Sequence, residues 1–152
     1  MQNAFAVWQR NRQFLKGLVS KFTLEQMNQI PSGFKNNLAW NLGHILVVQQ
    51  RLVYALSGLP IHFEKEIADK YLPGSSPESP ITQEELDKLV NAIDLLFEQT
   101  VKDFEDGKFQ HFHPYKTHTG FEIPDWETAV NFNNFHEGVH LGYMLAMSKG
   151  LK

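Results

Sequence analysis

The chain has 152 residues, 42% of them hydrophobic, and this size and composition suit one domain with a single core, so residues 1–152 are expected to form one domain. Its 14 lysines and arginines nearly balance 17 aspartates and glutamates and form neither a run nor a helical stripe, which argues against nucleic acid as the main partner. Because the chain has no cysteine, disulfides, thiolate metal ligands and a cysteine nucleophile are excluded, and any thiol chemistry needs an external thiol.

Nothing in the sequence indicates a targeting or membrane-spanning segment. Residues 1–10 lack the basic and apolar regions of a signal peptide. No stretch approaches the 18 or so unbroken apolar residues of a transmembrane helix. We therefore expect a soluble, cytoplasmic protein with no membrane partner.

The first segment, from about Gln2 to Ser20, has the periodicity of an amphipathic helix. Its inward stripe consists of Phe5, Trp8, Arg12, Leu15 and Val19. A short helical turn is expected after Thr23, because Thr23 and Gln26 have the spacing of a capping box. Neither segment carries residues that point to chemistry.

The second long helix is expected from about Asn37 to Ser57, with Asn36 or Asn37 as its N-cap and Gly58-Leu59-Pro60 as its stop. One stripe of this helix is apolar. A neighbouring stripe mixes polar groups into it, at Asn37, Asn41, His44, Val48 and Arg51. Such a stripe suits the wall of a pocket. In the alternative, Asn41 and Arg51 are solvated and His44 only forms a hydrogen bond within the core.

Residues 59–81 form a proline-rich connection of a length that is unusual between helices of a compact domain. A long crossover allows the second and third long helices to run parallel. The expected fold is therefore all-α, a four-helix bundle in which the helices run up-down-down-up. His62, Lys70 and Tyr71 of this connection are expected at the surface.

The third long helix begins after the N-cap Thr82 and ends near Phe104, and its apolar face shows no chemistry, so Asp103 is expected to be solvated. The next segment contains His111, His113 and His118. The alternation of His111 and His113 is a familiar metal-ligand spacing, but exposed loop histidines are common. Whether these three histidines contribute to a site stays open.

The fourth long helix, from about Asp125 to Ser148, places His136 and His140 four residues apart on its packed face. Asn133, one turn earlier, is a candidate to orient one of these rings. Glu137 projects about 100° away from His136, so we expect it to be solvated rather than a general base. Gly138 and Gly142 lower the helix propensity, which close approach of a neighbouring helix or a metal could offset.

Two histidines one helical turn apart are close enough to bind one metal ion, and His44 of the second helix is the best candidate for a third ligand. The spacing alone is weak support, because seven histidines produce such a pair by chance often enough. The inward position of the pair is stronger support, since a buried polar ring needs a partner. The hypothesis is a three-histidine metal centre between two helices, and the alternative is that the histidines bind no metal.

The order and spacing of these segments resemble the DinB/YfiT-like superfamily over nearly the whole chain. Leu42-Gly43-His44-Ile45 is similar to its second-helix motif, and His136-x-x-x-His140-x-Gly142 is similar to its fourth-helix motif. Residues 115–124 are similar to the segment that these proteins carry before the last helix. No departure occurs at the three histidine positions.

The resemblance implies a four-helix bundle, often a homodimer, in which His44, His136 and His140 hold a divalent metal ion, usually zinc or nickel. Some members of the superfamily are thiol-dependent S-transferases or isomerases, others resemble metal-dependent hydrolases, and many have no known activity. The leading hypothesis is therefore an enzyme that acts on a small molecule, either a metal-dependent hydrolase or a transferase that uses a low-molecular-weight thiol, and whether the chain is an enzyme stays open. Asn41, Asn133 and Arg51 are the expected supporting or pocket residues. The rival function is a non-catalytic binding or interaction module that the metal stabilises.

Overall fold

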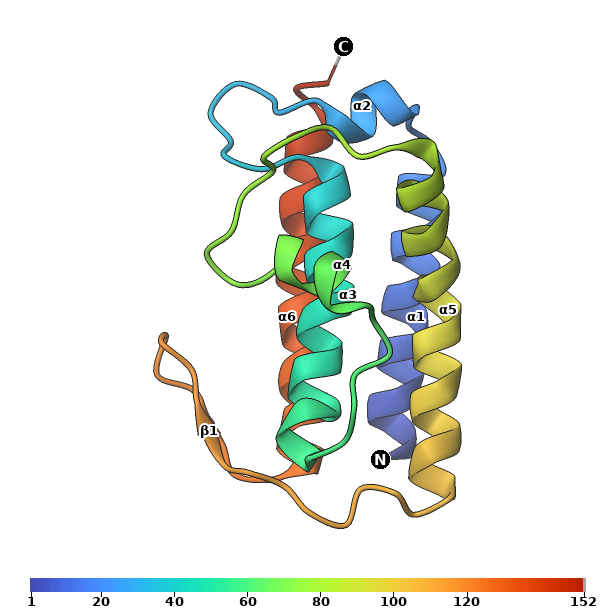
Figure 1. Ribbon diagram of the computed structural model, residues 1–152, viewed down its shortest axis with the longest axis vertical. Coiled ribbons are helices and arrows are strands. Elements are labelled where there is room, and N and C mark those ends of the chain that lie inside the picture. The colour runs from blue at the N-terminus through green and yellow to red at the C-terminus, as the bar shows by residue number, and fades with distance from the viewer. Residues whose placement is uncertain (152) are drawn as a thin grey trace.

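A computed structural model describes residues 1–151 and shows an all-α fold, as predicted (Figure 1). The four long helices are α1 (Gln2–Val19), α3 (Leu38–Val53), α5 (Gln83–Glu105) and α6 (Trp126–Ser148). The short elements are α2 (Leu24–Asn28), the 3-10 helix η1 (Ala55–Ser57), α4 (Lys65–Lys70), β1 (Tyr115–Lys116) and β2 (Glu122–Ile123). Among residues 1–151, no helix combines the length and the apolarity that are needed to cross a membrane.

Side-chain caps start four helices at the residues that the sequence indicated. The hydroxyls of Thr23 and Thr82 accept hydrogen bonds from the backbone N–H groups three residues later, and Thr23 also forms the predicted capping box with Gln26. Asn37 and Asp125 cap α3 and α6 in the same way, with donor–acceptor distances of 2.7 Å. These caps satisfy backbone donors that a helix leaves unpaired at its first turn.

The four long helices lie side by side around the core. Both α1 and α3 contact both α5 and α6, so the contacts form a closed ring. In Figure 1, α1 and α6 run upward, whereas α3 and α5 run downward. The connection after α3 climbs the length of the molecule before α5 begins, which gives α3 and α5 the same direction.

Helix α3 is the most buried element of the fold. All of its residues are buried except Arg51. The apolar ones pack into two hydrophobic clusters, one with α5 and the end of α6 and the other around Trp8 and Trp126. Its polar residues therefore have to find partners inside the protein, because a buried polar group without a partner costs about 1–3 kcal/mol.

The crossover contains α4, which the sequence pattern did not predict, and it brings Tyr71 into the core rather than to the surface. A Cβ atom on Gly43 would lie 2.5 Å from the Tyr71 ring, so the glycine of α3 makes room for this ring. The Tyr71 hydroxyl donates to Glu85 of α5 at 2.7 Å. His62 and Lys70 of the same connection are exposed, as expected.

The sequence did not predict a hairpin, and the expectation for Asp103 was wrong. Strands β1 and β2 pair antiparallel in a hairpin that projects beside α6, and His118 lies exposed between them. Asp103 is buried rather than solvated, because its carboxylate accepts hydrogen bonds from Tyr54 at 2.8 Å, Gln99 at 2.9 Å and Lys108 at 2.6 Å. This network joins α5 to Tyr54 at the end of α3 and to Lys108 just after α5.

Candidate metal centre

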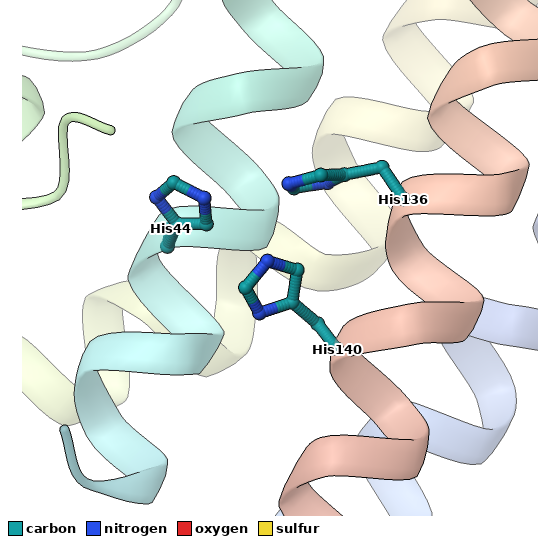
Figure 2. A group of neighbouring side chains, drawn as sticks. All are labelled: His44, His136 and His140. Carbon is teal, nitrogen blue, oxygen red and sulfur yellow. The ribbon is translucent and has the colours of Figure 1, made fainter. Parts of the chain in front are cut away.

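Helices α3 and α6 bring the three predicted histidines together (Figure 2). The ring centroids of His44 and His136 are 5.2 Å apart, those of His44 and His140 are 4.8 Å apart, and those of His136 and His140 are 4.5 Å apart. One ring nitrogen from each residue lies within 4.8 Å of the other two. Tetrahedral coordination at about 2.0–2.1 Å separates ligand nitrogens by roughly 3.4 Å, so modest ring movements would close the site around one ion.

Two of the three rings are held by hydrogen bonds at the nitrogen nearer the backbone. His44 Nδ1 donates to the carbonyl oxygen of Tyr71 at 2.8 Å. His140 Nδ1 lies 2.8 Å from Asn41 Oδ1, and Asn41 Nδ2 donates to the carbonyl oxygen of Asn37 at 2.8 Å. Because Asn41 Nδ2 already donates to Asn37, the atom that Asn41 presents to His140 is its acceptor, Oδ1. His140 Nδ1 must therefore carry the proton of this hydrogen bond. The Nε2 lone pairs of His44 and His140 are then free for a metal.

Burial keeps the three imidazoles neutral, which is the form that binds a metal. Burial, together with the neighbouring His140 and His44, lowers the pKa of His136 to about 2. Burial and, to a smaller extent, His44 lower the pKa of His140 to about 4. The pKa of His44 is lowered by burial, although its hydrogen bond to Tyr71 opposes this shift.

Trp40 covers one side of the cluster and was not anticipated as a site residue. Its ring stacks on that of His44 with a centroid distance of 4.5 Å and an interplanar angle of 14°. The indole N–H donates to Ser75 Oγ of the crossover at 3.0 Å. The sequence pattern that could have identified Trp40 is its position four residues before His44, which places both side chains on the same side of α3.

The expected supporting residues differ in where they lie. Asn41 is buried and bonded to His140, as a supporting residue should be. Asn133 is also buried, but its Nδ2 donates to Glu137 Oε1 at 2.8 Å rather than contacting a histidine ring. The side chain of Arg51 is exposed on α3 and has no hydrogen bond or ion pair to residues 1–151, and its assignment as a pocket residue stays a prediction.

The expectation that Glu137 is solvated was wrong, because α1 supplies it with partners. Only 1% of Glu137 is exposed. Its Oε1 accepts hydrogen bonds from Trp8 Nε1 at 2.8 Å and from Arg12 Nη2 at 2.7 Å. The signal in the sequence was Arg12 itself, a cation on the apolar stripe of the first helix that needs a buried anion. Glu137 is thus held in a buried ion pair through Oε1, while its Oε2 has no hydrogen-bond partner among residues 1–151.

The remaining histidines do not join the cluster. His111, His113 and His118 are exposed. Within residues 1–151, the group of potential metal ligands that the fold assembles consists of His44, His136 and His140, and it includes no carboxylate.

The structure thus defines an all-α protein with a cluster of three histidines between two helices. The chain belongs to the DinB superfamily, whose family model matches residues 6–144. No curated protein matches at a significant level.

Two solved structures match the chain, to different extents. A conserved protein from Enterococcus faecalis superposes with a TM-score of 0.67 at 12% identity, over 99% of this chain and 95% of that one. A mycothiol-dependent maleylpyruvate isomerase gives a TM-score of 0.46 at 13% identity, over 93% of this chain and 59% of that one. At such low identity, the first of these similarities shows the fold alone.

The metal-free protein should lose stability as the pH falls from about 7 to 5. In the unfolded chain His136 and His140 take up protons near pH 6.5, whereas in the folded protein their pKa values are about 2 and about 4. Below pH 6.5 the unfolded state therefore binds more protons. The free energy of unfolding should fall by up to about 1.4 kcal/mol per pH unit for each group. Urea unfolding in the presence of a chelator measures this dependence.

The matched control is His140→Gln, which removes one titrating group and should make this pH dependence shallower. His113→Gln, at an exposed position, should leave it unchanged. An equal slope of unfolding free energy against pH for the wild-type protein and His140→Gln would contradict the lowered pKa of His140.

Proposed function

We propose that His44, His136 and His140 bind one divalent metal ion, zinc or nickel, and that the site is catalytic. The observation that carries this proposal is the convergence of three neutral rings, with the Nδ1 atoms of two of them already used. Imidazole nitrogens suit both metals. Three protein ligands leave coordination positions open, which is the usual pattern of a catalytic rather than a structural zinc site.

A bound metal would supply Lewis acidity, either to polarise a substrate carbonyl or to lower the pKa of a bound water or thiol. The protein residues have simpler roles. Tyr71 and Asn41 fix the orientation of two rings, and Trp40 covers the outer side of His44. These contacts hold the ligands in place for the reacting molecule.

The absence of a carboxylate from the described ligand group favours a thiol over water as the nucleophile. Glu137 is buried against Arg12 and Trp8 of α1 and does not belong to the ligand group. A thiol has an unperturbed pKa of about 8.5, against 15.7 for water, and needs less help to ionise. We therefore favour a thiol-dependent transferase over a hydrolase, with a small molecule as substrate and an external low-molecular-weight thiol, since the chain has no cysteine.

A non-catalytic, metal-stabilised binding module is the second candidate. It is favoured by the position of the histidines, which join two different helices, so that a metal would cross-link α3 to α6. In this case the bound ion would contribute to folding stability instead of chemistry.

We also propose that the domain is an up-down-down-up four-helix bundle. The closed ring of contacts among the four long helices supports this topology. The shared direction of α3 and α5 supports it as well.

A homodimer through the outer face of α6 is part of the proposal. Phe135 and Val139 are 52% and 53% exposed on this face, and a Cβ on Gly138 or Gly142 would meet nothing within 4 Å. Between residues 127 and 149, α6 has one acidic or basic residue apart from histidine, and that residue is the buried Glu137. An uncharged apolar face meets no charge repulsion from its own copy, and a two-fold contact pairs the same patch on both subunits.

Untagged protein loaded with zinc or nickel should hold about one ion per chain. His44→Ala and His136→Ala should each weaken binding by at least about 100-fold, because each removes a ligand. His111→Ala, at an exposed position, is the control and should bind like the wild type. Elemental analysis and calorimetric titration measure this, and undiminished binding by both ligand variants would rule out the site.

The metal-loaded protein should consume model electrophiles only when a low-molecular-weight thiol is present. Turnover should fall to background in His140→Ala, which lacks one metal ligand, and after chelation, which removes the metal ion. Hydrolysis of model esters or amides without thiol would identify a hydrolase instead. The absence of activity in both assays, together with unfolding of the protein on chelation, would support the non-catalytic binding module.

Sedimentation equilibrium should show a dimer that Val139→Glu converts to a monomer, because the substitution places a charge on the outer face of α6 of each copy. Leu95→Glu is the control, since Leu95 is 61% exposed on α5. It should leave the dimer intact. A monomeric wild-type protein would refute this part of the proposal.

A further inference from the structure

His136 differs from the other two histidines of the cluster. His44 and His140 each use Nδ1 in a hydrogen bond. His136 Nδ1 is buried and has no hydrogen-bond partner among residues 1–151. Metal-bound histidines almost always donate the other ring N–H to an acceptor, which fixes the ring and raises its basicity as a ligand. A third anchor is therefore expected close to His136.

Asn133 offers an acceptor in the right place. It lies three residues before His136 on α6, where side chains of a helix are neighbours, with Cβ atoms about 5–6 Å apart. Asn133 is fully buried, and its Oδ1 also has no hydrogen-bond partner among the described residues. Two adjacent buried groups, one able to donate and one able to accept, are thus both unsatisfied.

The Asn133 amide cannot turn freely, because its other end is held. Asn133 Nδ2 donates to Glu137 Oε1, so the acceptor end points elsewhere. Glu137 is held in turn by the guanidinium of Arg12 and the indole N–H of Trp8, both from α1. A buried ion pair contributes little net stability, since desolvation offsets much of the attraction. A role in orienting Asn133 gives this costly pair a function.

We propose that Asn133 is the positioning residue for His136, and that its Oδ1 accepts the Nδ1–H of that ring, directly or through one water, when Nε2 binds the metal. The inference rests on the proposed metal site and deepens it. The Arg12–Glu137 pair then sets the orientation of the acceptor. In this way α1, which supplies no ligand, contributes to metal affinity.

A pair of variants separates this role from a purely structural one. Asn133→Leu and Asn133→Asp both remove the amide donor to Glu137, but only the Asn133→Asp variant keeps a side-chain oxygen that can accept from His136. Both variants should unfold at lower urea concentrations than the wild type when metal-free. Asn133→Leu should weaken Zn²⁺ affinity by about 10–100-fold, whereas Asn133→Asp should stay within about threefold of the wild type.

Asp103→Asn is the matched control for stability, because it disturbs the other buried carboxylate network without touching α6. It should lower stability and leave Zn²⁺ affinity unchanged. Equal Zn²⁺ affinities for Asn133→Leu and Asn133→Asp would overturn the inference. So would a loss of Zn²⁺ affinity in proportion to the loss of stability across all three variants.

A measurement on the wild-type protein covers the case in which these variants do not fold. In the Zn²⁺-loaded protein, ¹⁵N NMR should show the His136 ring protonated at Nδ1 and metal-bound at Nε2. Coordination through Nδ1 would overturn the inference while leaving the metal site intact. Failure of the wild-type protein to bind Zn²⁺ or Ni²⁺ would refute the proposed function, and this inference with it.

Discussion

The nearly complete burial of α3 is the constraint on which the site depends. The buried polar side chains on this helix cannot reach water, so each is paired within the protein. Gln49 donates to Thr100 of α5 at 3.1 Å, and Asn41 uses both ends of its amide on Asn37 and His140. The hydrogen bonds to Asn41 and to the Tyr71 carbonyl hold His140 and His44 in defined orientations. The same burial keeps the rings neutral, so that packing, hydrogen bonding and readiness for a metal follow from one feature of the fold.

The inner and outer sides of α6 carry different kinds of residue. Its inner side carries the histidine pair together with Glu137, whose charge is matched by Arg12 from α1. Its outer side is apolar and uncharged around Phe135 and Val139. The outer side of α6 is therefore apolar, whereas the outer side of a helix exposed to water is usually polar. An apolar outer side is typical of a helix that packs against other elements on both sides. Two of the three clustered histidines and the proposed dimer face thus lie on the same helix.

Much of the fold and of the cluster was predictable because it depends on local pattern. Caps such as Asn37 and the helical periodicity fix where the long helices lie, and the spacing of His136 and His140 is set by one turn of helix. The contacts of Tyr71 and Glu137 were not predictable in this way. They depend on how the crossover folds back onto α3 and on which residues α1 turns toward α6, and these are contacts between segments far apart in the sequence.

The central claim is that the three imidazoles share one metal ion. X-ray absorption at the metal edge of the zinc-loaded, untagged protein tests it most directly. The account predicts a first shell of three nitrogens at about 2.0–2.1 Å with imidazole scattering, completed by one or two oxygens. A shell dominated by oxygen, or one that does not change in His44→Ala, would contradict it.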